Sequence, residues 1–253
     1  MDLKIKDVAE LLNVSETTIR RWLADEKIPA YRINHQYRFS RLEIEDWVLS
    51  HKLGKSTNTL VTFNETEKTQ EKLPSTQASG GNKQFSLFRA IHKGGILLNV
   101  PGNNKEEIIR ATMRRVAGDL NLDADVISDL LLDREALQST ALNNGIAIPH
   151  TRDFLLNAHF DLVTVVFPEK PIPYDSLDGK NVHTLFFLFA SDDKRHLHLL
   201  AKIAHLSSLP ETMELLQSKP SKEKFLEYIK EWESSIQQPK GEQDAAMSQT
   251  LEK

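Results

Sequence analysis

The chain has 253 residues, of which 40% are hydrophobic and 27% are charged, and its formal net charge is -4. This length allows two globular domains, and the net negative charge excludes a basic protein that coats nucleic acid, so any DNA-binding face must be local. The chain has no cysteine, which excludes disulfides, thiolate zinc sites and cysteine nucleophiles.

Residues 1–52 predict a small unit that begins with two short helices joined by a tight turn. Apolar residues at positions 8, 9, 11 and 12 have helical spacing, and Ser15 is a suitable N-cap for a second helix. In that second helix Ile19 and Trp22 share one face, and two adjacent arginines lie on the other. This arrangement follows the helix-turn-helix plan, in which exposed arginines contact guanine or phosphate.

A hairpin and a third helix complete this unit. Two short alternating runs flank residues 34–36 and predict a wing, and an apolar helix follows Ser40. Through residues 7–15, 18–22, 27–30 and 38–39 the unit resembles the excisionase-like, MerR-type winged helix-turn-helix family. The resemblance implies binding to double-stranded DNA. The candidate DNA-binding residues are Thr17, Thr18, Arg20, Arg21, Arg32 and Arg38.

The nearly balanced charge of residues 1–52 also fits a small protein-interaction module. Its arginines, however, lie on the second helix and the hairpin, whereas its acids gather at residues 25–26 and on the third helix, and a segregated basic face is typical of DNA binding. A unit of this size contacts few phosphates. We therefore expect useful binding to require a homodimer on paired half-sites.

Residues 53–84 are polar and predict a flexible linker, and residues 237–253 predict a disordered tail. Between them, residues 85–236 predict an α/β domain in which helices sandwich a mixed sheet. Two nearly continuous apolar runs, 162–167 and 182–189, are typical of central strands covered on both faces. The other expected elements are a helical turn at 86–91, a strand at 95–100 and helices at 104–116, 123–132, 195–206 and 222–233, the second of these with Val126, Ile127, Leu130 and Leu131 facing inward.

The most informative stretch of the chain is residues 143–151. A short apolar run, residues 146–148, stops at Pro149, which cannot donate to a sheet ladder, so the run predicts a strand that ends at a sheet edge. His150 would then be held rigidly just past the strand and remain reachable. Imidazole can act as a nucleophile near neutral pH. The plain alternative is a surface histidine after a strand-terminating proline.

Residues 85–235 resemble the EIIA domains of the bacterial phosphoenolpyruvate phosphotransferase system through three short sequence motifs. They are Asp-Arg-Glu at 133–135, Ser-Thr at 139–140 and Asn-Gly-Ile-Ala-Ile-Pro-His at 144–150. The similarity is greatest to the fructose/mannitol type and its nitrogen-regulatory branch. It implies that His150 accepts a phosphoryl group from a histidine phosphocarrier of the HPr kind.

The same resemblance implies roles for other residues. His196, which precedes a Leu-x-x-Leu pattern, matches the family's second histidine and would hydrogen-bond the phosphoryl group. Arg134 would neutralise phosphate charge, and Ser139 and Thr140 could offer further donors. His183, His198 and His205 are interpreted as packing or helix-surface residues.

We do not expect a metal site, because the sequence places no matching acidic ligand near His150, and we expect no cofactor.

Together these features predict a regulator that couples phosphorylation of His150 to DNA binding. The alternatives are a sugar-transport EIIA that passes phosphate to a separate EIIB, and an unphosphorylated scaffold that binds other proteins. No stretch is long and apolar enough to cross a bilayer, and the first residues lack a signal-peptide core. We therefore expect a cytoplasmic protein that makes no contact with the membrane and is a phosphoryl carrier rather than a turnover enzyme.

Overall fold

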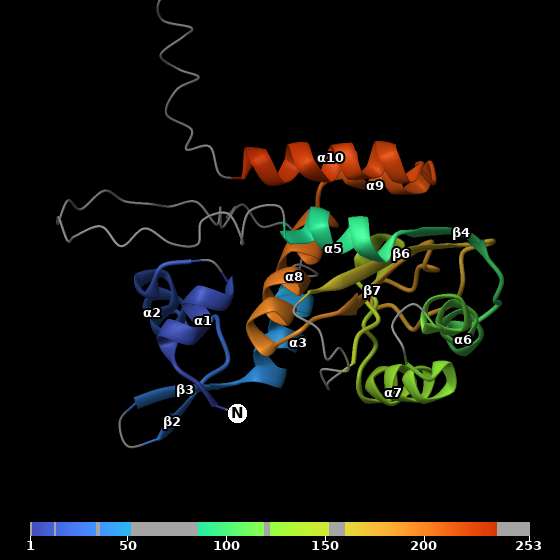
Figure 1. Cartoon of the computed structure of the whole chain (residues 1–253). Coiled ribbons are helices and arrows are strands. Elements are labelled where there is room, and N and C mark those ends of the chain that lie inside the picture. Colours follow the sequence, from blue (N-terminus) through green and yellow to red (C-terminus); the bar gives the residue numbers. More distant parts are fainter. Residues whose placement is uncertain are drawn as a thin grey trace, which may run out of the picture.

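The computed structural model describes residues 2–12, 14–33, 36–51, 86–118, 122–151 and 160–236. The predicted linker at 53–84 and the predicted tail at 237–253 lie outside these residues. We call residues 2–51 the N-terminal unit and residues 86–236 the C-terminal unit, and Figure 1 shows them packed side by side. None of the helices in the described part of the chain is long and apolar enough to span a membrane.

The N-terminal unit has the predicted helix-turn-helix and hairpin. The side chain of Ser15 caps the second helix by accepting the Thr18 N–H at 3.1 Å, and the rings of Trp22 and Trp47 pack 5.4 Å apart. Its three strands form an antiparallel sheet in the order β1-β3-β2. The elements are β1 (Asp2–Leu3), α1 (Ile5–Leu12), α2 (Glu16–Ala24), β2 (Tyr31–Ile33), β3 (Gln36–Ser40) and α3 (Arg41–His51).

The C-terminal unit is built on a four-stranded mixed sheet in the order β4-β6-β7-β5. The central strands β6 and β7 are antiparallel, and the outer strands β4 and β5 each run parallel to their neighbour. Its elements are α5 (Ser86–Gly94), β4 (Ile96–Val100), α6 (Lys105–Val116), α7 (Ala124–Leu137), β5 (Ile146–Ala147), β6 (Leu162–Pro168), β7 (Thr184–Phe189), α8 (Asp193–Leu206), α9 (Pro210–Gln217) and α10 (Lys222–Ser235).

Every residue of β6 and β7 is buried, which confirms the predicted central strands. Their alternate residues divide between two cores, because successive side chains of a strand point to opposite faces. Phe186 packs with α5, α8 and α10 in one core, and Phe187 packs with α6 and α7 in the other. Figure 1 shows these two layers of helices on opposite sides of the sheet. The predicted α/β sandwich is thus confirmed.

Helix α7 differs from its prediction in length and in the face it buries. It begins after the N-cap Asp123 and continues to Leu137 rather than ending at residue 132. Val126, which we predicted to face inward, is 57% exposed. The buried stripe instead includes Arg134 and Glu135, so part of the helix packs through polar side chains that the apolar pattern does not reveal.

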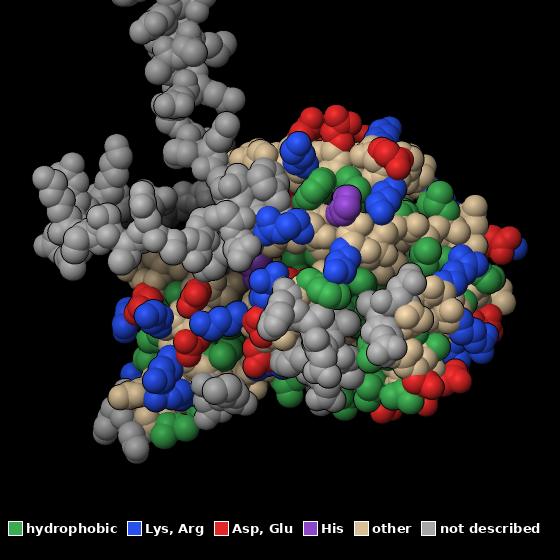
Figure 2. All heavy atoms as spheres, in the orientation of Figure 1, with side chains coloured by type: hydrophobic (Ala, Val, Ile, Leu, Met, Phe, Trp, Pro, Cys, Tyr) green, Lys and Arg blue, Asp and Glu red, His purple; other side chains and the backbone are tan. Residues whose placement is uncertain are grey.

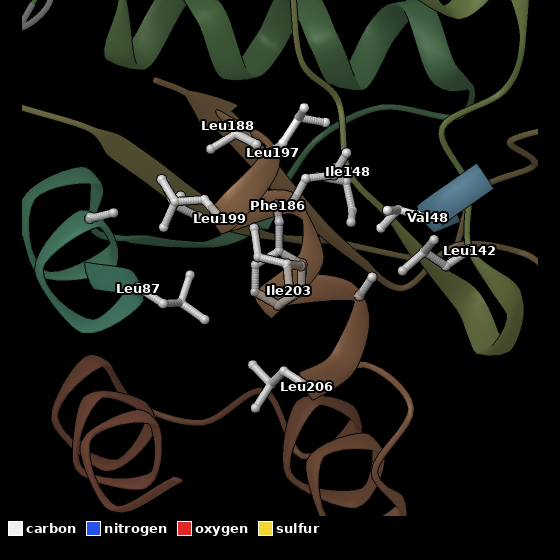
Figure 3. Packing of buried hydrophobic residues seen from close by; sticks show 14 of the residues in the cluster. Val48, Leu87, Leu142, Ile148, Phe186, Leu188, Leu197, Leu199, Ile203 and Leu206 are labelled. Atoms are coloured by element: carbon white, nitrogen blue, oxygen red, sulfur yellow. The ribbon is translucent and has the colours of Figure 1, made fainter. Parts of the chain in front are cut away.

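The core beneath α8 continues into the N-terminal unit. Ile44 and Val48 of α3 belong to the same apolar cluster as Leu142, Ile148 and Leu197. Figure 3 shows Val48 beside Leu142 and Ile148, and both α1 and α3 pack against α8. The two units therefore meet through an apolar interface at the end of β5, where the chain places His150.

Candidate functional site

Backbone contacts on two sides fix the position of His150. The Leu188 N–H donates to the Pro149 carbonyl at 3.0 Å, and the Ile148 N–H donates to the Thr140 carbonyl at 3.1 Å. Strand β5 lies at the sheet edge, as predicted. The His150 Nδ1 lies 2.6 Å from the carbonyl oxygen of Ile148. Because a carbonyl only accepts, Nδ1 carries a proton, and Nε2 is the ring nitrogen left for a second partner.

The two other residues predicted for the site lie beside His150, although they come from different helices. His196 is in the first turn of α8, and its ring centroid is 5.1 Å from that of His150. Arg134 is in the last turn of α7, where its Nη1 donates to the Gln138 carbonyl at 3.0 Å. All three side chains are buried. We call His150, His196 and Arg134 the histidine pocket.

The pocket also contains a residue that sequence reasoning missed, Glu45 of α3. One carboxylate oxygen, Oε1, lies 2.5 Å from the His150 Nε2 and 3.1 Å from the Arg134 Nη2. The other oxygen, Oε2, lies 3.6 Å from the His196 Nε2. The next residue, Asp46, also contacts the Arg134 Nη2 at 3.2 Å. The N-terminal unit thus places an acidic side chain among the three groups of the histidine pocket.

This contact corrects one expectation about His150. We predicted a reachable ring, but His150 is only 1% exposed. The reason is that α3 of the other unit lies over Nε2 and buries Glu45 against it. One signal for this contact was available in the sequence. Glu45 lies between the apolar residues Ile44 and Val48 of the third helix. It therefore belongs to the face of the helix that packs against another element.

The charges in the pocket determine its protonation. Burial by itself would raise the pKa of Glu45, but the charge and the hydrogen bond of His150 hold that pKa well below its usual range. Glu45 is therefore a carboxylate, which only accepts hydrogen bonds. The His150 Nδ1 also faces an acceptor, the Ile148 carbonyl, so the His150 ring donates a hydrogen bond from each of its nitrogens in this arrangement.

His196 is in a different state. Burial lowers its pKa below the ordinary value, so the ring is neutral at pH 7. Its Nε2 is buried and has no hydrogen-bond partner among the described residues, because 3.6 Å from Glu45 exceeds hydrogen-bond distance.

The same three side chains could also hold a cation. The ligand atoms of Glu45, His150 and His196 lie within 4.8 Å of one another, and imidazole with carboxylate is a usual zinc ligand set. Our argument that no acidic ligand lies near His150 is therefore wrong, because the acid comes from the other unit. Arg134 offsets the charge of this carboxylate from 3.1 Å and would compete with a cation for the same oxygen.

The remaining candidates of the C-terminal unit have contacts away from the pocket. The Ser139 hydroxyl donates to the Tyr174 carbonyl at 2.8 Å, and the Thr140 hydroxyl donates to Glu135. His183 lies 2.8 Å from the Thr184 hydroxyl, and His198 lies 3.2 Å from the Ser86 hydroxyl. His205 packs against the Trp232 ring at 5.7 Å.

The candidate DNA-binding residues lie on α2 and on the hairpin of β2 and β3, both on the far side of the N-terminal unit from β6 and β7 (Figure 1). Arg20 and Arg21 are exposed, and Arg20 pairs with Glu16 at 3.5 Å. Arg32 stacks over Tyr37 at 4.6 Å, and Arg38 donates to the Gln36 side chain at 2.8 Å.

The two threonines on α2 differ. Thr17 is exposed, but the Thr18 hydroxyl lies 2.9 Å from that of Ser15 at the helix start. In the view of Figure 2, basic and acidic side chains are interspersed over the N-terminal unit.

These features define a protein with two units, a helix-turn-helix and an α/β domain with a pair of buried histidines, and comparisons with known families agree. The model of the phosphoenolpyruvate-dependent sugar phosphotransferase system, EIIA 2, matches residues 89–232. A helix-turn-helix domain model matches residues 3–52. The chain belongs to the EIIA 2 family, and both resemblances drawn from the sequence are confirmed.

Individual relatives cover the C-terminal unit. A nitrogen regulatory protein of Pseudomonas aeruginosa is 34% identical over 146 residues, which are 56% of this chain and 94% of that protein. A mannitol-specific phosphotransferase enzyme IIA component of Geobacillus stearothermophilus is 30% identical over 149 residues, 56% of this chain and 95% of that protein. The crystal structure of the nitrogen regulatory protein IIA-Ntr from Neisseria meningitidis matches 56% of this chain and 94% of its own, with 25% identity and a TM-score of 0.49.

Proposed function

We propose that this protein is a cytoplasmic regulator that accepts a phosphoryl group on His150 from an HPr-like histidine phosphocarrier and couples this modification to DNA binding by its N-terminal unit. One observation carries the proposal. The His150 Nε2 faces a pocket that contains Arg134 and His196, and the same pocket is in contact with a helix of the helix-turn-helix unit.

The proposed reaction needs a neutral His150 ring with its proton on Nδ1, the tautomer that the Ile148 carbonyl favours. The lone pair of Nε2 attacks the phosphorus of the carrier's phosphohistidine. A new N–P bond forms at His150, the carrier's P–N bond breaks, and its electron pair returns to the carrier imidazole. Positioned positive and donor groups stabilise the charge spread over the phosphoryl oxygens.

Two residues of the pocket fit this stabilising role. Arg134 is a fixed cation beside Nε2, since both contact the same Glu45 oxygen. The buried Nε2 of His196, which has no hydrogen-bond partner among the described residues, would gain one in a phosphoryl oxygen. A buried polar atom without a partner costs free energy, so the phosphorylated pocket would satisfy a group that is otherwise unsatisfied.

The DNA-binding part of the proposal rests on the exposed arginines of α2 and the hairpin. The acids of α3 support it, because Glu45 and Asp46 contact Arg134 of the C-terminal unit and so lie away from these arginines. We expect a homodimer on paired half-sites, because one small unit makes few phosphate contacts.

Mannitol-specific relatives make a transport EIIA the second candidate. Transfer of phosphate from His150 onward to a separate EIIB would favour that function over regulation. The third candidate is an adaptor that does not bind DNA. It would be favoured if the protein were not retained on DNA at low salt and if Arg20→Ala and Arg21→Ala behaved like the parent.

Phosphotransfer in a reconstituted system tests the proposed function. The full chain is incubated with phosphoenolpyruvate, enzyme I and a histidine phosphocarrier, and acid-labile phosphate is located by mass spectrometry. We expect one phosphohistidine in the parent, none in His150→Ala, and parental labelling in the control His205→Ala. DNA retention of the two forms is then compared at fixed salt. Lack of label both in the parent and in a variant without the Glu45 carboxylate, or label that persists in His150→Ala, would overturn the phosphoryl-carrier function.

A further inference from the structure

We propose that Glu45 is an internal ligand of the histidine pocket, so that docking of α3 and phosphorylation of His150 exclude each other. The face of α3 that carries Glu45 is an interaction surface, and its partner is the unphosphorylated pocket of the same chain. This inference rests on the proposed function, since it assigns to the phosphoryl site a second, competing occupant.

Space is the first reason for this exclusion. The Glu45 Oε1 lies 2.5 Å from the His150 Nε2, the atom that would form the N–P bond. A covalent N–P bond is shorter than this hydrogen bond, and the phosphorus brings three oxygens with it. The phosphoryl group would therefore occupy the position of the Glu45 carboxylate, and α3 must move away before a carrier can reach the nitrogen.

Charge is the second reason. The carboxylate is held by Arg134, which would hold the phosphoryl oxygens, and by His150, which would carry the phosphoryl group. Phosphorylation would add about two negative charges at this point, next to the buried Glu45 and the partly exposed Asp46. Like charges in a buried site repel strongly. A phosphorylated pocket would thus bind Arg134 through its own oxygens and expel the acidic face of α3.

The proton on Nε2 is the third reason. In the docked arrangement His150 donates from Nδ1 to the Ile148 carbonyl and from Nε2 to the Glu45 carboxylate. A ring that carries both protons has no lone pair with which to attack phosphorus. Departure of α3 removes the acceptor that faces Nε2, and a neutral ring with its proton on Nδ1 has the lone pair that the transfer needs. Docking therefore blocks both access to the nucleophile and its reactivity.

The interface around Glu45 also contains apolar contacts and two further ion pairs. Ile44 and Val48 are buried in the same core as Leu142 and Ile148 (Figure 3). Two ion pairs join α8 to the N-terminal unit, Arg41 to Asp193 at 2.6 Å and Glu10 to Lys194 at 3.3 Å. Apolar burial supplies much of the attraction between the two units. The charge of Glu45 adds to this attraction in the unphosphorylated form and opposes it in the phosphorylated form, so it can decide whether the docked or the undocked form dominates.

The docked form leaves the DNA-contacting arginines on the surface. Arg20, Arg21 and Arg32 are exposed while Glu45 is buried. Phosphorylation would therefore change the position and freedom of the helix-turn-helix unit relative to the C-terminal unit, rather than uncover α2. In a homodimer this change would alter the spacing of two such units, which sets the half-site spacing on DNA.

The first experiment measures the rate of phosphotransfer to the full chain. Glu45→Gln keeps the shape of the side chain and removes its charge. Glu43→Gln is the matched control, because Glu43 is an exposed glutamate on the same helix. We expect Glu45→Gln to be phosphorylated at least about tenfold faster than the parent, because a buried ion-pair network loses one partner, and Glu43→Gln to match the parent. Equal rates in Glu45→Gln and the parent would overturn the inference.

The second experiment measures docking directly and does not depend on a variant of the pocket. The chain has no cysteine, so Lys6→Cys with Lys230→Cys places one spin label on an exposed site of each unit. We expect one narrow distance in the unphosphorylated protein and a broad distribution after phosphorylation. An unchanged narrow distance in protein shown to be phosphorylated would overturn the inference.

Failure of this inference can be distinguished from failure of the proposed function. If neither the parent nor Glu45→Gln accepts phosphate, the proposed function is wrong. The labelled Glu45→Gln protein still tests the docking contact in that case. A broader distance in unphosphorylated Glu45→Gln than in Glu43→Gln would support Glu45 as the residue that holds the two units together, and identical distances would contradict it.

Discussion

Glu45 and Glu233 are both buried glutamates, yet their partners differ in where they lie in the chain. Glu233 on α10 accepts the N–H groups of Leu87 and Phe88 at 3.0 Å and the Lys202 ammonium at 2.5 Å. All of these belong to the C-terminal unit. The ion-pair partners of Glu45 in the described part of the chain all lie across the interface between the two units. A buried carboxylate held by its own unit stabilises the fold, whereas one held by another unit can be released without unfolding either.

Substitution of Glu233 should have the largest effect on stability. Glu233→Ala leaves the α5 N–H groups and Lys202 without their acceptor. Loss of one partner from a buried ion pair costs about 3–5 kcal/mol, and we expect the unfolding free energy of the C-terminal unit to fall by that amount. Calorimetry with Glu45→Ala as the comparison checks this. An equal loss of unfolding free energy in Glu45→Ala would contradict the distinction between the two glutamates.

Arg134 should affect both functions of the pocket. Arg134→Ala removes the cation shared by Glu45 and the expected phosphoryl group. Loss of one stabilising donor typically lowers a rate about 100- to 1000-fold, so we expect slow phosphotransfer even though docking is weakened. The initial rate of label incorporation measures this effect. A faster rate than in the parent would mean that Arg134 acts only as a partner of Glu45.

Val48 tests the apolar part of the interface without changing any charge. Val48→Ala removes two methyl groups from the cluster with Leu142 and Ile148. We expect docking to weaken by about 1–2 kcal/mol, which corresponds to a roughly 5- to 30-fold shift in the docking equilibrium. Spin-label distances in the unphosphorylated protein should broaden accordingly. An unaltered distribution would show that the ion pairs alone hold α3.

Asp46 should contribute less than Glu45, although both contact Arg134. The Asp46 side chain is 40% exposed, whereas that of Glu45 is 2% exposed. A solvent-exposed ion pair is worth at most about 1 kcal/mol. We therefore expect Asp46→Asn to raise the phosphotransfer rate only a few fold, in the same assay. An effect as large as that of Glu45→Gln would mean that Glu45 and Asp46 together, rather than the buried carboxylate of Glu45 alone, control phosphotransfer.

Removal of metal should have the smallest effect. Arg134 offsets the charge of Glu45, so docking needs no cation. We expect a chelator to leave the spin-label distance unchanged and added zinc to leave it unchanged as well. A distance that broadens with the chelator and narrows again with zinc would show that Glu45, His150 and His196 bind a metal that joins the units.

The sequence predicted those parts of the site whose signals are local. Pro149 predicted a strand end at a sheet edge, and His150 lies three residues after β5, which is the edge strand. Arg134 and His196 were found by resemblance, and the structure brings both to the pocket. Glu45 could not be placed this way, since it is 105 positions from His150 and no spacing rule relates two separate units. The burial of His150 was missed for the same reason.

The covalent connection between α3 and the pocket has a kinetic consequence. Both lie on one chain, with α3 ending at His51 and α5 beginning at Ser86. An undocked α3 remains on the same chain as its site, and such tethering raises the effective concentration of a ligand at its site. A soluble phosphocarrier at lower concentration cannot displace it by simple binding competition. It can react only while α3 is undocked, and the N–P bond that forms then keeps α3 undocked. Hydrolysis of that bond would return the protein to the docked form without a second protein.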